Sequence, residues 1–407
     1  DYQQYLAMVG EAISRLHLPE KPAGLYNPIT YTLDCGGKRL RPVLTLAACQ
    51  AMGKDPMTAI HQAIAIEMFH NFTLLHDDVM DKADVRRGRP TVHVKWNEQT
   101  AILSGDAMLT TSTMLLAVKA GDKLQTALEL FNGTAMNIYE GQQYDMDFES
   151  RTDVTVEEYM EMIRLKTSVL LGCACAMGAL MAGAPMETQI RFFDYGVNLG
   201  LAFQLQDDYL DTYGNPETFG KAIGGDILND KKTWLLIMAL NEDKTGTIKS
   251  LLGSRENPQE KIAKVREVYD RLNLPERIHE LIRAYIDTAI KCLDHLELGP
   301  EARAFFMDLA QICITRQVSL FDTHTHLYLP EFEEDATSAV DRAIEAGVSR
   351  LMLPNVDLNT VEPLIELHRK YPDSTLMAMG LHPTEIGESY RDDLTRIKNI
   401  LYSAPDD

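Results

Sequence analysis

The chain has 407 residues, of which 45% are hydrophobic and 24% charged, and its formal net charge at pH 7 is −21. An acidic balance of this size excludes general binding to nucleic acid or to an anionic membrane surface, so any phosphate must be bound by local clusters of Lys and Arg. The length corresponds to two or three typical domains, or to one large helical domain with an addition.

The six cysteines are scattered, without CxxC pairs and without the spacing of a metal site or disulfide framework. Such usage is typical of a reducing compartment and favours the cytoplasm. The sequence has no basic-then-apolar start and no uninterrupted apolar run of membrane length. We therefore expect neither a signal peptide nor a membrane span.

From the start to about Gln317, apolar residues recur at helical spacing and breaks fall at Pro/Gly points. The long amphipathic segments predict a large bundle whose interior is lined by several helices. These segments cover residues 59–81, 100–118, 156–181 and 187–213. We therefore expect residues 1–317 to form an all-α domain.

Two of these segments carry the same acidic pattern, DDxxD, near their carboxyl ends and about 130 residues apart. On a helix the first and last Asp of each pattern share one face, within reach of a hard cation. Apolar residues precede both patterns, and uncompensated carboxylates beside a core are costly. A solvated acidic face is the alternative for either cluster alone, but the pair favours Mg²⁺ ions around a diphosphate. The clusters are Asp77, Asp78 and Asp81, and Asp207, Asp208 and Asp211.

Two glycine-associated basic clusters supply the opposite charge. They are GGKRLRP at residues 36–42 and DVRRGR at residues 84–89. Arg binds phosphate oxygens through paired hydrogen bonds and Lys binds them as a point charge. An ordinary basic surface loop is the alternative for either cluster, and it is less attractive in a chain this acidic.

The order of motifs GGKRLRP, FHNFTLLHDDVMD, RRGRPTVH, GDAML, KT, FQLQDDYLD, GK and KKT resembles the trans-isoprenyl diphosphate synthases over roughly residues 1–317. The resemblance implies the all-α isoprenoid synthase bundle and a homodimer. It also implies a prenyltransferase that condenses isopentenyl diphosphate with an allylic diphosphate, by head-to-tail elongation, to a short-chain trans-prenyl diphosphate. The released pyrophosphate is the base that this family is expected to use.

The resemblance also assigns roles to residues of this chain. Asp77, Asp81, Asp207 and Asp211 match Mg²⁺ ligands, and Asp78, Asp208 and Lys166 complete the catalytic set. The matches to the allylic diphosphate site are Arg86, Lys166, Thr167, Gln204, Lys221 and Lys231, where the adjacent Lys232 could replace Lys231. The matches to the isopentenyl diphosphate pocket are Lys38, Arg41, His70 and Arg87.

Product length is predicted from the helix before the first cluster. Phe72 and Phe69 lie five and eight residues before Asp77, roughly on its face and one and two turns down the expected prenyl cavity. Thr73 is smaller than the aromatic residue of some farnesyl-type synthases, and the first cluster lacks the two-residue insertion of many bacterial ones. We expect geranylgeranyl or farnesyl diphosphate, with the former favoured.

The pattern changes at residue 318. Strands are predicted at 318–321, 349–353 and 375–379, and helices at 335–346, closed by Gly347, and 361–370. This βαβαβ order is typical of an α/β fold. The last 90 residues carry 17 acidic and 7 basic side chains, and no Gly/Ser- or Pro-rich linker precedes them. We expect residues 318–407 to form a partial α/β domain.

His324 and His326 end the first predicted strand as an HxH pair, and alternate residues of a strand point the same way. A polar strand end is the alternative to a metal site. With LPNVD at 353–357 and MGLHP at 379–383, the segment resembles the start of the TatD family of metal-dependent hydrolases, which are TIM barrels with deoxyribonuclease activity. The segment supplies about three of eight βα units. We therefore expect no hydrolase activity unless another polypeptide completes the barrel.

Two other functions were weighed against the prenyltransferase. A class I terpene cyclase also ionises allylic diphosphates, but it needs no isopentenyl diphosphate pocket, so Lys38, Arg41 and Arg87 argue against it. The second DDxxD argues against it too. A metal-dependent nuclease or hydrolase would be centred on His324 and His326.

Overall fold

The structure is a computed structural model that describes residues 2–214, 223–254, 257–314, 320–322, 325–332, 335–345, 348–372, 374–380 and 389–403. Contacts divide the chain into two compact units. The first comprises Asp1–Thr212 and Gly224–Thr315, and the second comprises Arg316–Asp407 together with Tyr213–Ile223.

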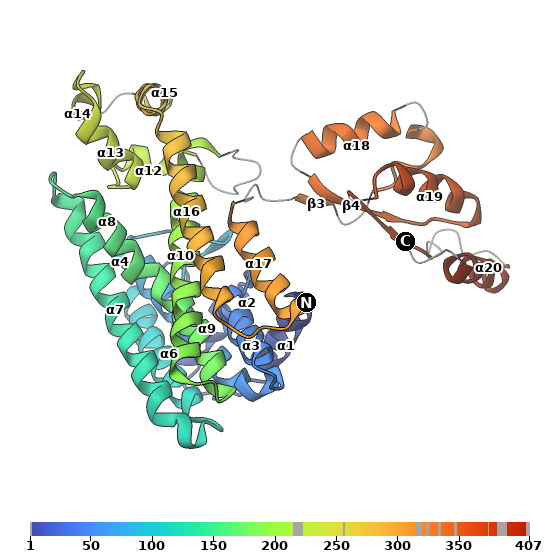
Figure 1. Ribbon diagram of the computed structural model, residues 1–407, viewed down its shortest axis with the longest axis horizontal. Coiled ribbons are helices and arrows are strands. Elements are labelled where there is room, and N and C mark those ends of the chain that lie inside the picture. The colour runs from blue at the N-terminus through green and yellow to red at the C-terminus, as the bar shows by residue number, and fades with distance from the viewer. Residues whose placement is uncertain are drawn as a thin grey trace. The chain divides into compact units, whose positions relative to one another are not determined.

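The first unit is a bundle of helices (Figure 1). Its amino-terminal half contains α1 Tyr2–Ser14, α2 Ala23–Asp34, α3 Leu40–Ala51, η1 Pro56–Ala59, α4 Ile60–Met80, α5 Val92–Lys95, α6 Glu98–Ala117, η2 Gly121–Lys123 and α7 Leu124–Ser150. It continues with α8 Val156–Ile163, η3 Arg164–Ser168, α9 Val169–Met181, α10 Met186–Tyr213, α12 Gly225–Leu228, α13 Trp234–Glu242, α14 Thr247–Leu251, α15 Pro258–Arg271, α16 Leu274–Asp294 and α17 Pro300–Ile314.

The predicted all-α fold of this unit is confirmed, and the helices α4, α6 and α10 lie close to the predicted segments. Two local features were not predicted. The strands β1 (Val85–Arg86) and β2 (Arg89–Pro90) form an antiparallel ribbon after the first acidic cluster. The predicted helix 156–181 is divided into α8, a single turn of π-helix and α9.

The core of the bundle is organised around α9. All residues of α9 are buried, and the helix packs against α3, α4 and α7. By length and composition alone, the stretch Val156–Met181 could cross a membrane, but 83% of its most apolar window is buried inside the bundle. Its apolar character is therefore explained by its central position among other helices.

The second unit contains a three-stranded parallel sheet in the order β3-β4-β5. Its elements are β3 Leu320–Asp322, η4 Pro330–Phe332, α18 Ala336–Glu345, β4 Val348–Pro354, η5 Leu358–Thr360, α19 Val361–Lys370, β5 Thr375–Ala378 and α20 Tyr390–Ser403. The helices α18 and α19 connect successive strands, and a small core that includes Val340, Leu353 and Leu364 joins the helices to the sheet. Residues 318 and 319 of the first predicted strand, and Gly347, lie outside the described residues.

Candidate active site

The first acidic cluster ends α4. Asp77 and Asp78 occupy its last turn, and Asp81 is the residue at which the helix stops. The carboxyl end of a helix carries partial negative charge, so carboxylates there require nearby cations. Arg86 of β1 supplies one, because its Nε and Nη2 lie 2.8 and 2.7 Å from Asp78 Oδ1, whereas Nη2 lies 3.8 Å from Asp77 Oδ2. Asp78 is therefore committed to Arg86, and Asp77 is left more open.

Lys166 faces the open carboxylate of Asp77. Its Nζ lies 3.6 Å from Asp77 Oδ1 and 2.6 Å from Oδ2 of Asp145 on α7. Asp77 Oδ1 is buried and accepts no hydrogen bond. Partial desolvation, followed by the charge of Asp77, raises the pKa of Asp81. Asp145 is a member of this site that the sequence did not reveal, because nothing in its spacing marks it.

The π-turn explains how two consecutive residues reach different helices. It is Arg164–Ser168, packed closely against α7 and α10: a Cβ on Gly141 would lie 2.3 Å from Lys166 N, and one on Gly200 would lie 2.6 Å from Ser168 Cα. Lys166 contacts Asp145 of α7, while Thr167 Oγ1 lies 3.4 Å from Gln204 Oε1 of α10. Single π-turns inside helices occur frequently at functional sites.

The second acidic cluster lies near the end of α10 in a more enclosed setting. Asp208 is only 2% exposed; Tyr159 donates a hydrogen bond to its Oδ2, and Gln204 Nε2 donates to Oδ1 at 3.2 Å. Burial raises the pKa of Asp208 to about 7, in spite of the opposing charge of Lys231. Asp211 Oδ2 accepts the backbone N–H of Asp226 at 2.9 Å. Asp207 is half-buried.

Lys231 is the cation of the second cluster. Its Nζ lies 3.6 Å from Asp226 Oδ1. Burial alone would lower the pKa of Lys231, but the carboxylates of Asp226, Asp208 and Asp145 raise it. Asp145 acts on Lys166 as well, so its charge links the two clusters. Asp226 is a second residue that the sequence did not reveal.

The side chain of the neighbouring Lys232 points toward α7 and not toward Asp226. Its Nζ lies 3.4 Å from the backbone oxygen of Glu149. Of the two adjacent lysines, Lys231 is the one whose ammonium faces the acidic cluster. Lys221, predicted to contact the same diphosphate, lies outside the described residues.

The aspartates suit a hard cation without forming a finished cage. Within the described ranges, no three Asp, Glu, His or Cys side chains converge in a metal-binding arrangement. The buried Oδ1 of Asp77, which accepts no hydrogen bond, is a hard oxygen donor of the kind that Mg²⁺ prefers. The donor chemistry of Asp77 therefore fits Mg²⁺.

A separate cationic cluster contains three of the predicted isopentenyl diphosphate residues, Arg41, His70 and Arg87. Arg41 Nη1 lies 3.2 Å from His70 Nε2, and Arg41 Nε is buried without a partner. Burial lowers the pKa of Arg41 to about 10. Burial, followed by the charges of Arg41 and Arg87, holds the pKa of His70 well below 6.5. An uncharged His beside concentrated Arg charge makes a cluster whose positive charge favours an anion.

The glycines of GGKRLRP allow Arg87 to approach the loop. Arg87 Nη1 donates to the backbone oxygen of Gly36, and a Cβ on Gly37 would lie 2.9 Å from Arg87 Cζ. Gly37 also has a φ of 129°, which disfavours any other residue. Lys38, the remaining predicted isopentenyl diphosphate residue, is exposed on the loop.

Arg39 of the same loop also points into the protein, where it pairs with an acidic side chain. Its Nη1 lies 2.5 Å from Glu67 Oε1, and Asn71 Nδ2 donates to the same oxygen at 2.8 Å. Arg39 also donates to the backbone oxygen of Leu33. Arg39 therefore anchors the loop between Lys38 and Arg41.

Aromatic side chains surround the face of α4 below Asp77. Phe69 and Phe72 are buried, with ring centroids 5.4 Å apart, and each lies 6.4 Å from Tyr139 of α7. Phe72 also packs edge-on against His76 at 4.8 Å. Thr73 donates its hydroxyl to the backbone oxygen of His70 at 2.8 Å. Tyr139 is an aromatic residue of this cluster that sequence reasoning did not include.

Comparison with known proteins identifies the source of this arrangement. Residues 22–272 match the family model for Polyprenyl synthetase. The chain is 36% identical over 311 residues to the geranylgeranyl diphosphate synthase of Methanosarcina mazei, covering 76% of this chain and 95% of that protein. The chain belongs to the polyprenyl synthetase family. As a polyprenyl synthetase, it carries its acidic clusters and basic loops within the matched residues.

Two further relatives agree. This polyprenyl synthetase is 39% identical over 295 residues to the geranylgeranyl diphosphate synthase of Saccharolobus solfataricus, covering 70% of this chain and 89% of that one. A crystal structure of a geranylgeranyl pyrophosphate synthase superposes with a TM-score of 0.73 at 43% identity, covering 77% of this chain and 97% of that chain.

The second unit matches a different family. Residues 321–406 match the model for TatD related DNase. His326 Nδ1 lies 2.8 Å from the hydroxyl of Tyr328, which in turn donates to the backbone oxygen of Pro354. His324, the other member of the predicted pair, lies outside the described residues.

Proposed function

We propose that this polyprenyl synthetase is a trans-prenyltransferase that condenses isopentenyl diphosphate with an allylic diphosphate to a short-chain trans-prenyl diphosphate. One observation carries the proposal. Lys166 lies between Asp77 and Asp145, and Lys231 is paired with Asp226 near the second cluster. Arg41 and Arg87 belong to a separate cationic cluster around His70. One diphosphate site rich in carboxylates and another rich in cations are what a two-diphosphate reaction requires.

In the carboxylate-rich site, Asp77, Asp81, Asp207 and Asp211 are proposed to hold Mg²⁺, which when bound neutralises charge on the departing diphosphate. Arg86, Lys166, Thr167, Gln204, Lys221 and Lys231 are proposed to bind the same diphosphate. Asp78 and Asp208 act through their neighbours, because one is paired with Arg86 and the other with Tyr159 and Gln204. Asp145 and Asp226 join the site by orienting Lys166 and Lys231.

In the cation-rich site, Lys38, Arg41 and Arg87 are proposed to hold isopentenyl diphosphate, and neutral His70 donates a hydrogen bond to it. The allylic C–O bond breaks as Lys and Arg stabilise the leaving oxygen. The double bond of isopentenyl diphosphate then forms the new C–C bond. The released pyrophosphate takes the final proton, so no side-chain nucleophile is needed.

The favoured product is geranylgeranyl diphosphate, with farnesyl diphosphate as the shorter alternative. The buried rings of Phe69 and Phe72, closed by Tyr139, support an early limit on chain growth, and Thr73 leaves room above them. The relatives named geranylgeranyl diphosphate synthase support the same length.

A homodimer is proposed, with α6 and α7 at its interface. Both helices expose large apolar side chains, among them Leu103 (59% exposed) and Met114 (67%) on α6 and Met136 (56%) on α7. Exposed apolar surface of this kind is typical of protein interfaces. Light scattering of Leu103→Glu/Met114→Glu is expected to give a monomer where the wild type gives a dimer, and an unchanged mass would refute this interface.

We also propose two domains, residues 1–317 and 318–407, and a cytoplasmic location. The described cysteines are free, and Cys49, Cys173, Cys175 and Cys292 are buried. Residues 318–407 are proposed to form the opening βαβαβ part of a TatD-like barrel, supported by the parallel order β3-β4-β5. His324 and His326 alone are too few ligands for a hydrolytic metal site.

The proposed function is tested by incubating the protein with Mg²⁺, labelled isopentenyl diphosphate and an allylic primer, followed by product chromatography. Label should appear in a prenyl diphosphate, mainly the geranylgeranyl form. Absence of incorporation with every allylic primer would refute the transferase. Cyclic hydrocarbon without incorporation would indicate the terpene cyclase, and DNA hydrolysis would indicate the alternative centred on the second unit.

A further inference from the structure

The turn that leads from α12 to Lys231 places a non-glycine residue in the left-handed backbone region. Asp230 has a φ of 51°. Its N–H donates to Ile227 O at 3.2 Å, and the N–H of Lys231 donates to Asp226 O at 3.0 Å, the two bonds of a Schellman helix end. Glycine is favoured at this position because a Cβ is strained there. An Asp in this conformation therefore indicates that its side chain has a structural role.

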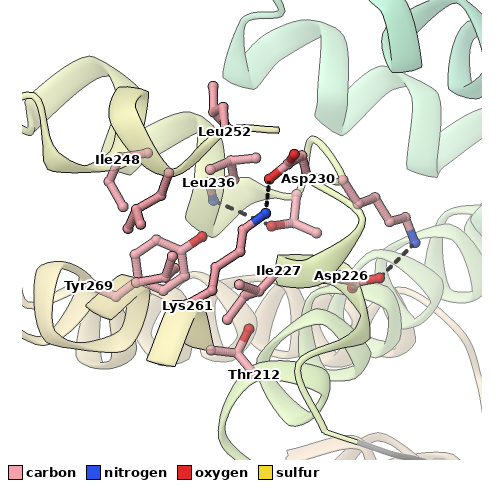
Figure 2. Close-up of a pocket in the computed structure, with 13 residues that line it drawn as sticks. Thr212, Asp226, Ile227, Asp230, Leu236, Ile248, Leu252, Lys261 and Tyr269 are labelled. Carbon is pink, nitrogen blue, oxygen red and sulfur yellow. Dashed lines mark hydrogen bonds and ion pairs between the residues drawn. The ribbon is translucent and has the colours of Figure 1, made fainter. Parts of the chain in front are cut away.

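Both carboxylate oxygens of Asp230 are engaged. Oδ1 accepts a hydrogen bond from Lys261 Nζ at 2.7 Å, and Oδ2 accepts the backbone N–H of Gly253 at 2.7 Å. Lys261 belongs to α15, and Gly253 follows α14. In Figure 2 the long side chain of Lys261 extends to Asp230 on one side of the turn, while Asp226 is joined to a lysine on the other. Asp230 therefore ties the turn to two other segments.

The ion pair between Asp230 and Lys261 is partly buried, because the side chain of Asp230 is 24% exposed whereas that of Lys261 is almost fully enclosed. The side chain of Lys261 is 4% exposed, and it lies in a small cavity with mainly apolar walls that include Leu236, Ile248 and Tyr269 (Figure 2). Separating a charge pair in apolar surroundings is unfavourable, because each charge is then left uncompensated. This pair is therefore suited to holding the turn of Asp230 in one position on α15.

The helix that carries Lys261 also holds the end of α10. Arg266 of α15 donates to the backbone oxygen of Thr212, the residue directly after Asp211. One helix thus contacts both the turn that presents Lys231 and the segment that presents the second acidic cluster. The position of the Lys231 ammonium relative to that cluster depends on α15.

We propose that the Asp230–Lys261 ion pair positions Lys231 against the second acidic cluster, which makes Lys261 a positioning residue for the allylic diphosphate. This inference rests on the proposed function. Asp230 and Lys261 do not themselves bind substrate, since each is engaged by the other. Their effect is exerted through Lys231 alone.

The test uses the full chain and the double variant Lys261→Met/Asp230→Gly. This variant leaves no unpaired buried charge and places glycine at the left-handed position, so the fold should be kept. KM for the allylic diphosphate should rise about tenfold, and KM for isopentenyl diphosphate should stay within about twofold of wild type. In a Lys231→Ala background the same double change should have no further effect on the allylic KM.

Two other variants guard against a purely structural effect. Asp230→Asn keeps the size and the left-handed preference of the residue but leaves the Lys261 ammonium without its partner, so its free energy of unfolding should fall while the allylic KM rises in the same selective way. Arg277→Met breaks the pair between α16 and Glu242 of α13, whose N–O distances are 2.8 and 2.9 Å, and it should leave the allylic KM unchanged.

The positioning role would be overturned by an unchanged allylic KM, by a parallel rise of both KM values, or by an equal rise in the Lys231→Ala background. Wild-type protein that incorporates no isopentenyl diphosphate would instead overturn the proposed function. The two failures are therefore distinguished by the wild-type control.

Discussion

The two acidic clusters have the same spacing of aspartates but lie in different surroundings. In the first, Asp78 is paired with Arg86 from a two-stranded ribbon, and Asp77 keeps a buried oxygen without a hydrogen bond. In the second, Asp208 is enclosed by Tyr159 and Gln204, and Asp211 accepts a backbone N–H of Asp226. The middle aspartate of each pattern organises its neighbours. A repeated motif therefore does not imply a repeated set of roles.

The residues that precede the clusters differ as well. Five and eight positions before the first cluster stand Phe72 and Phe69, where the second has Ala202 and Leu199. His70 lies seven positions before the first cluster, and Gly200 lies at the matching position before the second cluster. Bulk on α4 suits control of product length, whereas Gly200 on α10 admits the π-turn that carries Lys166.

The largest effect is expected from Asp77→Asn, compared with Asp78→Asn. Removing this carboxylate should lower kcat about a thousandfold, because the proposed site would lose a ligand of the Mg²⁺ that neutralises charge on the leaving diphosphate. Asp78→Asn should lower kcat by a smaller factor, since Asp78 acts on the diphosphate site only through its partner Arg86. Steady-state kinetics with excess Mg²⁺ measure both. Equal losses in the two variants would remove the distinction between outer and middle aspartates.

Phe72→Ala tests whether α4 limits the product. The variant should form longer prenyl diphosphates, seen by chromatography, and its free energy of unfolding should fall by about 3–5 kcal/mol through loss of a buried ring. Leu199→Ala, in the matching stretch of α10, is the control and should destabilise without lengthening the product. Unchanged length in Phe72→Ala would exclude this ring as the limit.

Tyr159→Phe tests the enclosure of Asp208. Loss of the hydroxyl leaves a buried carboxylate oxygen without its donor, which should reduce the free energy of unfolding by about 1–3 kcal/mol and also lower kcat. The control is Tyr195→Phe, which removes a different buried hydroxyl. The hydroxyl of Tyr195 donates to the backbone oxygen of Phe306 at 2.7 Å. That control should lose stability and keep kcat. Loss of kcat in both would show that Tyr159 acts only through packing.

The smallest effect concerns pH and His70. The pKa of His70 in the folded state lies well below 6.5. As the pH falls through 6.5, this histidine therefore binds a proton in the unfolded chain but stays neutral in the folded one. This linkage should lower the free energy of unfolding progressively as the pH falls below 6.5. His70→Gln, measured by urea unfolding, should lack that part of the acid loss. An identical acid profile in both proteins would contradict a neutral His70.

The sequence predicted the helical unit and the positions of α4 and α10, because apolar periodicity and motif order are local signals. It did not predict the π-turn, the ribbon of Val85–Arg86 with Arg89–Pro90, or the inward turn of Arg39. It also did not single out Asp145 and Asp226. Which carboxylate meets which lysine depends on helix packing, and one acidic residue on a helix face resembles another until Lys166 and Lys231 are placed.

The central claim is that the two clusters form two walls of one Mg²⁺–diphosphate site. The direct test is Mn²⁺ titration, followed by electron paramagnetic resonance, with a non-ionisable allylic diphosphate analogue present. We predict that Asp77→Asn and Asp207→Asn each reduce both the Mn²⁺ bound per chain and the affinity for the analogue. If either substitution leaves both quantities at wild-type values, its cluster is not part of the site and the claim is contradicted.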